Sequence, residues 1–119
     1  MSASPFHSLA SDTDWAEARS RSDEQPVLVF KHSNACPVSG NAAQEMRQLA
    51  ETDDLPVYKL VVQKSRALSD KIADTLDVRH ETPQAILLDE QAPVFHTSHF
   101  DVTAETLREA AHSDPPTTE

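Results

Sequence analysis

One segment of this chain carries most of the information about its architecture: Val27-Leu28-Val29-Phe30-Lys31-His32-Ser33-Asn34-Ala35-Cys36-Pro37-Val38-Ser39. Its first four residues form a short apolar, β-rich run, which is typical of a strand buried on both faces of a parallel sheet. Pro37 suits the first turn of a helix, where no amide hydrogen bond is lost. Apolar residues then recur at helical spacing, at Met46, Leu49 and Ala50. The segment therefore predicts a strand, a tight loop and a helix that begins at Cys36.

The flanking sequence predicts further elements of both kinds. The expected strands are a short edge strand at Phe6–Leu9, and further strands at Val57–Val62, Ala85–Leu88 and Val94–His96, the last two joined by a turn at Asp89–Gln91. The expected helices run from Ser11 and Asp12 to about Arg21, from a cap at Ser65 past Leu76, and from a cap at Thr103 past Ala111. The resulting order, β-α-β-α-β-α-β-β-α, matches the thioredoxin arrangement. We therefore expect an α/β, thioredoxin-like fold, with a central mixed sheet of four to five strands flanked by helices.

The size and composition of the chain favour one domain. Its 119 residues suffice for a single core, which we place at residues 1–112, with a polar tail at 113–119 expected to be disordered. Twenty acidic residues against ten basic ones give a formal charge of −10, which argues against nucleic acid or an anionic membrane as partner. A single glycine excludes a glycine-rich phosphate loop.

The single cysteine and the pattern of apolar residues both indicate the cellular compartment of the protein. One cysteine cannot form an internal disulfide and suits a reducing compartment. No apolar run approaches the roughly 20 residues of a membrane span, and residues 1–10 lack the pattern of a signal peptide. We therefore expect a cytoplasmic protein.

Cys36 is the candidate catalytic residue. Unpaired amides and the macrodipole at a helix N-terminus favour a thiolate, which is the reactive form of cysteine. Pro37 and Val38 separate Cys36 from Ser39, which gives the spacing of a Cys-x-x-Cys site without its second thiol. Ser39 could donate its hydroxyl to the thiolate but could not resolve a mixed disulfide, so a second small thiol must complete the cycle. The competing interpretation is an inert, buried cysteine.

Thr82-Pro83 provides a second candidate for the site. An X-Pro bond adopts the cis form at small cost, and a proline just before a β-rich run often marks such a turn. In thioredoxin-fold proteins a cis proline faces the active cysteine and leaves the preceding backbone free to pair with a bound thiol. The alternative is a trans proline that simply starts the strand.

Three separate blocks resemble the monothiol bacilliredoxin (YtxJ-like) family. They are Phe30-Lys31-His32-Ser33 with Cys36-Pro37-Val38-Ser39, then Val78-Arg79-His80-Glu81-Thr82-Pro83-Gln84, and His96-Thr97-Ser98-His99-Phe100. The similarity extends from about Leu9 to Ala110. Val38 replaces a frequent isoleucine, and Asn34-Ala35 varies from the commoner residues there.

The resemblance implies a thioredoxin-like fold and removal of bacillithiol, a cysteinyl-glucosaminyl-malate thiol, from S-bacillithiolated client proteins. It assigns the active cysteine to Cys36 and the cis proline to Pro83. Bacillithiol would act as co-substrate, with no bound cofactor and no metal. Its malate carboxylates call for a cationic contact. The candidates that we consider for this contact are Lys31, His32, Arg79 and His80.

Other functions are also compatible with these residues. His96-x-x-His99 has a spacing that could hold zinc, and Cys36 with His80 or His32 could form a hydrolase dyad. A glutathione-using monothiol glutaredoxin-like enzyme and a non-catalytic thioredoxin-fold interaction module are closer alternatives.

Overall fold

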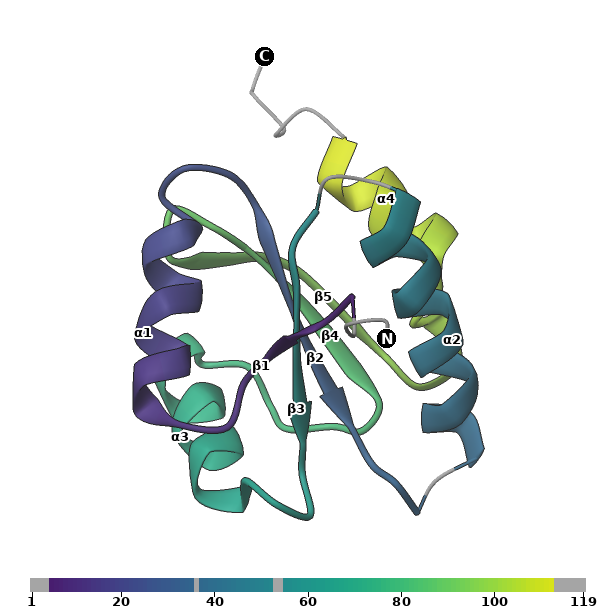
Figure 1. Cartoon of the computed structure of the whole chain (residues 1–119), viewed down its shortest axis with the longest axis horizontal. Coiled ribbons are helices and arrows are strands. Elements are labelled where there is room, and N and C mark those ends of the chain that lie inside the picture. Colours follow the sequence, from purple (N-terminus) through teal and green to yellow (C-terminus); the bar gives the residue numbers. More distant parts are fainter. Residues whose placement is uncertain (1–4, 36, 53–54, 113–119) are drawn as a thin grey trace.

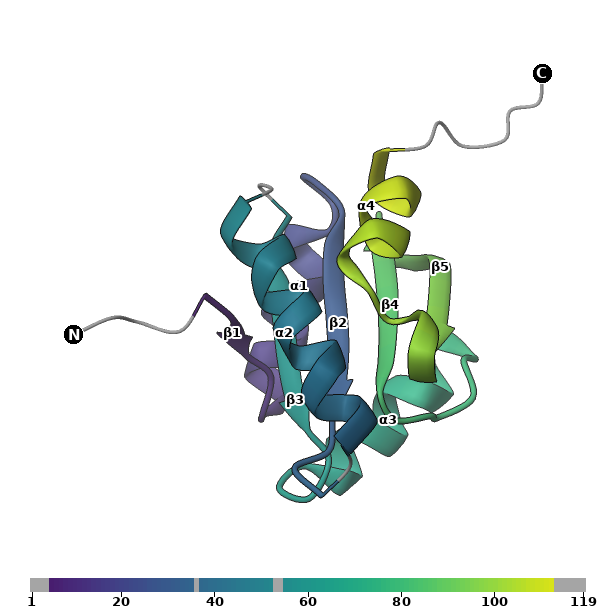
Figure 2. The same cartoon turned by 90° about the vertical axis from the view of Figure 1, so that its right-hand side faces the viewer.

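The computed structural model describes residues 5–35, 37–52 and 55–112. In this part of the chain a five-stranded mixed sheet has the order β1-β3-β2-β4-β5, and Figure 2 shows the strands in this order. The strands are β1 (His7–Ser8), β2 (Val27–His32), β3 (Val57–Val61), β4 (Gln84–Asp89) and β5 (Ala92–Ser98). The helices are α1 (Asp12–Arg21), α2 (Pro37–Thr52), α3 (Arg66–Leu76), the short 3-10 helix η1 (His99–Asp101) and α4 (Ala104–His112).

The apolar run of β2 forms the centre of the sheet. This strand pairs in parallel with β3 and antiparallel with β4, and all six of its residues are buried. Successive side chains of a strand point to opposite faces. Val27 and Val29 accordingly join the core under α1 and α3, whereas Leu28 and Phe30 join the core under α2 and α4. Figure 1 shows these two pairs of helices on opposite sides of the sheet.

Two of the predicted helix caps form and one does not. The hydroxyl of Ser11 accepts from the amide of Asp14 at 3.1 Å, and that of Thr103 accepts from Thr106 at 3.1 Å. Ser65 stands at the N-cap of α3, but its side chain makes no cap hydrogen bond. Its ψ of 48° departs from the extended backbone that a capping side chain needs, because the preceding turn bonds its amide to Val61. Ser65 therefore occupies the predicted N-cap position, but the capping hydrogen bond expected from its side chain does not form.

The predicted order of elements and the fold class are confirmed. The edge strand is shorter than expected, because only His7 and Ser8 pair with β3. Cys36 and the predicted tail at 113–119 lie outside the described residues. None of the described helices combines the length and apolar character needed to cross a membrane.

Candidate active site

The end of β2 sends its last two side chains to opposite faces of the sheet. Lys31 follows Val27 and Val29 towards α3, whereas His32 follows Leu28 and Phe30 towards the first turn of α2. Both are buried, with Lys31 at 0% and His32 at 8% exposure. Lys31 and His32 therefore belong to separate polar groups on either side of the loop at residues 33–35.

The group around His32 ties the loop to α2. Ser39, fully buried in the first turn of α2, lies with its Oγ 2.9 Å from Nδ1 of His32. The same oxygen accepts from the amide of Ser33 at 2.9 Å. On the other side of the ring, Nε2 lies 3.1 Å from Oδ1 of Asn34. Burial, followed by the charge of Lys59, lowers the pKa of His32. A neutral ring accepting from Ser39 and donating to Asn34 satisfies these contacts.

This arrangement gives Ser39 a structural role that the sequence did not predict. A serine hydroxyl has one proton to donate. Because a neutral His32 ring donates from Nε2 to Oδ1 of Asn34, its Nδ1 is unprotonated and accepts the proton of Ser39. The hydroxyl thus holds the loop, and the contact predicted between Ser39 and Cys36 lies outside the described residues.

Gln63, in the turn after β3, holds the other side of the loop. Its Nε2 donates to Oγ of Ser33 at 2.8 Å, and its Oε1 accepts from the amide of Asn34 at 3.2 Å. The hydroxyl of Ser33 also accepts from the amide of Ala35 at 3.2 Å. The residues immediately before Cys36 are therefore fixed by contacts from two elements.

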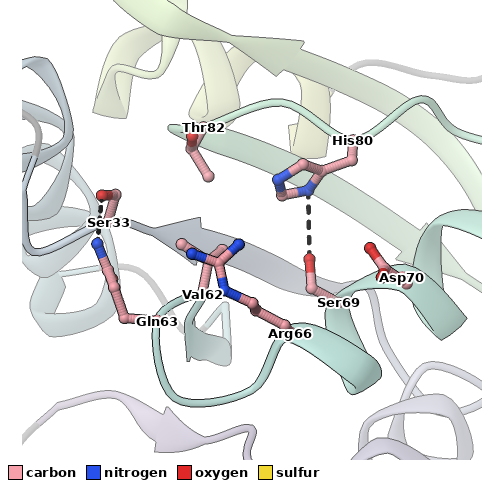
Figure 3. A pocket seen from close by; sticks show the side chains of 8 residues that line it. All are labelled: Ser33, Val62, Gln63, Arg66, Ser69, Asp70, His80 and Thr82. Atoms are coloured by element: carbon pink, nitrogen blue, oxygen red, sulfur yellow. Dashed lines mark hydrogen bonds between the residues drawn. The ribbon is translucent and has the colours of Figure 1, made fainter.

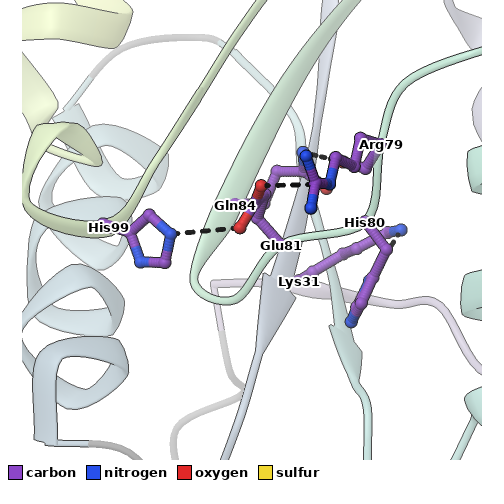
Figure 4. Close-up of polar contacts among 6 residues, drawn as sticks. All are labelled: Lys31, Arg79, His80, Glu81, Gln84 and His99. Atoms are coloured by element: carbon purple, nitrogen blue, oxygen red, sulfur yellow. Dashed lines mark hydrogen bonds and ion pairs between the residues drawn. The ribbon is translucent and has the colours of Figure 1, made fainter.

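The group around Lys31 lies on the α3 side. The Nζ atom of Lys31 donates to the carbonyl of Ser69 at 3.1 Å and lies 3.3 Å from Nδ1 of His80 (Figure 4). The hydroxyl of Ser69 lies 3.2 Å from the same Nδ1. Burial lowers the pKa of Lys31 to about 8, against a smaller opposing effect of Asp70. Burial, and then the charge of Lys31, also lowers the pKa of His80.

The Thr82–Pro83 peptide bond is cis, as the sequence predicted. The carbonyl of Pro83 accepts from the amide of His99 at 2.9 Å, and His99 Nε2 contacts Glu81 at 3.1 Å (Figure 4). The backbone of Thr82, in contrast, forms no hydrogen bond with any residue that the structure describes. It is open to a bound molecule in an extended conformation.

A pocket of about 300 Å³ lies between the loop at residues 33–35, α3 and the segment before Pro83 (Figure 3). It is lined by Ser33, Val62, Gln63, Arg66, Ser69, Asp70, His80 and Thr82. Its volume is at the lower end of small-molecule sites. Ser33 stands three residues before Cys36, and Thr82 directly precedes the cis proline. The pocket therefore adjoins both sequence segments that were predicted to form the site.

Comparison with known proteins agrees with this geometry. The family model of the monothiol bacilliredoxin BrxC matches residues 7–107. The chain belongs to the monothiol bacilliredoxin BrxC family. A solved structure of a candidate oxidoreductase with a thioredoxin fold is 33% identical and has a TM-score of 0.80, with coverage of 88% of this chain and 92% of that one.

Two thioredoxin structures share the fold at lower identity. A mutant thioredoxin from Halobacterium salinarum is 18% identical with a TM-score of 0.75, over 100% of this chain and 99% of that one. Thioredoxin from Fasciola hepatica is 18% identical with a TM-score of 0.73, over 89% and 96%. Membership in the bacilliredoxin family supports a thiol-disulfide redox function for this chain.

The structure places only one of the four predicted ligand contacts in the pocket. His80 lines the pocket, whereas Lys31 and His32 do not. Lys31 has no exposed surface, so a ligand in the pocket would meet His80 in front of it. Arg79 is 92% exposed in its side chain, lies outside the pocket lining and pairs with Glu81 at 3.9 Å. Of the four candidates, only His80 is positioned to touch a ligand in the pocket.

Sequence analysis missed the charged residues that do line the pocket. Arg66 and Asp70 are four residues apart on α3, and neither forms an ion pair within the described part of the chain. One signal was available for Arg66. A cation in the first turn of a helix opposes the macrodipole, so it stands there at a small cost in helix stability.

The histidine pair considered for zinc is separated by the structure. His96 lies on β5, whereas His99 begins η1 and contacts Glu81. Among the described residues, no three His, Cys, Asp or Glu side chains gather in a way that could hold a metal ion.

Proposed function

We propose that this bacilliredoxin is a monothiol thiol-disulfide oxidoreductase that removes bacillithiol from S-bacillithiolated proteins through a mixed disulfide on Cys36. One structural observation supports this proposal in addition to the family membership. A pocket lined by one cation and one anion, neither of which forms an ion pair within the described residues, adjoins the loop at residues 33–35 and the backbone that precedes the cis proline.

The proposed reaction has two exchange steps. The Cys36 thiolate attacks the bacillithiol sulfur of the client's mixed disulfide, so a new S–S bond forms and the client leaves with the electron pair of the old bond. A second thiolate then attacks the Cys36–bacillithiol disulfide and releases Cys36. Ser39 has no sulfur with which to resolve the intermediate. The second thiol must therefore come from another molecule.

The pocket suits a ligand that carries both signs of charge. The cysteinyl part of bacillithiol has an ammonium close to its sulfur, and its malate part has carboxylates at the far end. Asp70 can receive the ammonium, and Arg66 can bind a carboxylate through its planar guanidinium. The open Thr82 backbone is available to the cysteinyl backbone. On this basis the cationic contact expected from Arg79 is reassigned to Arg66.

Paired substrates test the assignment. One client protein is modified with bacillithiol or with glutathione, and release of each adduct is followed by mass spectrometry with wild type and Cys36→Ser. We expect faster removal of bacillithiol, a bacillithiol adduct on Cys36 of the wild type, and no removal by Cys36→Ser. Equal or faster removal of glutathione would instead indicate a glutaredoxin-like enzyme.

A thiol probe separates the enzyme from a non-catalytic module. We expect Cys36 to react with iodoacetamide at pH 6 faster than free cysteine, because an activated thiol is ionised below its ordinary pKa of about 8.5. Reaction no faster than that of free cysteine would contradict the proposed activation.

A further inference from the structure

Lys31 is a buried charge that the exchange steps above do not use. Its side chain has no exposed surface, and no carboxylate forms an ion pair with it in the described part of the chain. Its ammonium contacts are the carbonyl of Ser69 and Nδ1 of His80. Burying an ammonium without a carboxylate costs free energy, so a methionine-like side chain would fill this site more favourably. The contact with His80 connects this charge to the pocket.

The contact fixes the protonation of His80. An ammonium has only protons to donate, so Nδ1 of His80 must present its lone pair to Lys31. The neutral ring then carries its proton on Nε2, and Figure 3 shows the second ring nitrogen on the pocket side, away from Ser69. His80 thus offers an N–H group to the pocket and has an ammonium behind it.

The charges around Lys31 and His80 have mixed signs. Asp70 on α3 favours the charged forms of both Lys31 and His80, and Glu81 favours charged His80. Lys31 and Arg66 oppose charge on His80, and burial opposes it on both residues. The result is a ring held neutral beside a lysine whose pKa of about 8 is close to the roughly 8.5 of an alkyl thiol. Proton transfer from this lysine to an alkyl thiolate would thus be nearly balanced in free energy.

We propose that Lys31 and His80 form a proton-delivery pair, in which His80 protonates the departing client thiolate and Lys31 replaces the proton on the ring. This inference rests on the proposed function for the identity of the reaction. His80 would be the catalytic residue, since it faces the pocket, and Lys31 would act through it.

The transfer balances in protons and electrons. As the S–S bond breaks, the client sulfur keeps the electron pair and takes the proton from Nε2 of His80. Nδ1 takes a proton from the Lys31 ammonium, so the ring stays neutral and Lys31 becomes a neutral amine that Nδ1–H now contacts. Lys31 regains its proton from solvent through the same ring. The client leaves as a thiol rather than as an anion.

A comparison of leaving groups tests the pair. Mixed disulfides of bacillithiol with mercaptoethanol and with thionitrobenzoate differ in whether the departing sulfur needs a proton, because the aromatic thiolate is stable as an anion. In Lys31→Met and His80→Gln we expect kcat/KM to fall about tenfold for mercaptoethanol, within the reach of general acid catalysis. For thionitrobenzoate we expect less than about a twofold change.

The matched control is Lys64→Met, which removes an exposed lysine outside the pocket. Equal losses for both leaving groups would overturn the proposal and indicate a structural role.

The tautomer of His80 gives a readout that does not need turnover. Nitrogen-15 NMR of the ring should show a protonated Nε2 and an unprotonated Nδ1 in wild type, and a mixture of tautomers in Lys31→Met. A proton on Nδ1 in wild type would overturn the proposal.

The same two leaving groups attached to glutathione separate the bacillithiol assignment from the proton-delivery pair. If only glutathione disulfides are cleaved, the bacillithiol assignment fails, while the ratio between leaving groups still measures the pair.

Discussion

The Oγ atom of Ser39 lies 2.9 Å from Nδ1 of His32 and accepts at the same time from the amide of Ser33. This contact joins the last residue of β2 to the first turn of α2, on the two sides of Cys36 in the sequence. The position that holds a second cysteine in a dithiol site is therefore used here to hold the loop. Ser39 thus has two effects at once: it leaves the site without a second thiol, and it holds the loop through Ser33 and His32.

Ser39→Ala separates the structural role from the chemical one. The substitution leaves the buried amide of Ser33 and Nδ1 of His32 without their partner, which costs about 1–3 kcal/mol for a buried group left unsatisfied. We expect a loss of this size in urea unfolding and only a modest slowing of exchange, because Ser39 does not react with the mixed disulfide. Loss of all activity in a folded Ser39→Ala protein would show that the hydroxyl acts on sulfur.

Acid should destabilise the fold through His32. Burial and the charge of Lys59 hold its pKa below the ordinary value of about 6.5, so the unfolded chain takes up a proton before the folded one does. This contribution to stability is complete above pH 6.5 and is lost as the pH falls towards the folded pKa. We expect the free energy of unfolding to drop between pH 7 and pH 5 by more in wild type than in His32→Gln. His96→Gln, at an exposed histidine, should keep the wild-type dependence.

The fold could be predicted because its determinants are local in the sequence. The β2 run has enough consecutive apolar residues to be buried on both faces, and proline, serine and aspartate mark the boundaries of its neighbours. The cis bond at Pro83 was predictable for the same reason, since the proline stands just before a β-rich run. The absent cap at Ser65 depends on the turn before it, which residue type alone does not specify.

The site could be predicted only in part, because it combines elements that are distant in the sequence. Closeness in sequence placed Lys31 and His32 together as ligand contacts, but the two-residue period of a strand turns them to opposite faces. Arg66 and Asp70 share the pocket with His80 only because α3 packs beside the segment before Pro83. Within α3, only the position of Arg66 in the first turn is unusual for a cation, and nothing in the sequence of the helix marks Asp70 as part of a site.

Arg66 and Arg79 offer a matched pair for the binding pocket. Both are arginines near the proposed site, but only Arg66 lines the pocket, whereas the side chain of Arg79 is 92% exposed and pairs with Glu81. We expect Arg66→Gln to raise KM for a bacillithiol mixed disulfide about tenfold with little change in kcat, as for loss of a charge-assisted hydrogen bond. Arg79→Gln should stay within about twofold of wild type. A larger effect at Arg79 than at Arg66 would place the carboxylates outside the pocket.

Lys31→Met should stabilise the fold while it impairs the reaction. Burial lowers the pKa of Lys31 from 10.5 to about 8, and one pKa unit corresponds to about 1.4 kcal/mol, so holding the charge in the fold costs at most about 3.5 kcal/mol. The lost hydrogen bonds to Ser69 and His80 offset part of this, which leaves an expected gain of about 1–2 kcal/mol at pH 7.

The pH dependence of that gain gives the decisive measurement. A lysine with a lowered pKa destabilises the fold fully below about pH 8, and this penalty disappears as the pH rises towards 10.5, where the unfolded chain also loses the proton. The difference in unfolding free energy between Lys31→Met and wild type should therefore shrink between pH 8 and pH 10, while Lys64→Met shows no such trend. A variant that is less stable than wild type at pH 7 would mean that the hydrogen bonds of Lys31 outweigh the cost of burying it, and that its retention needs no catalytic explanation.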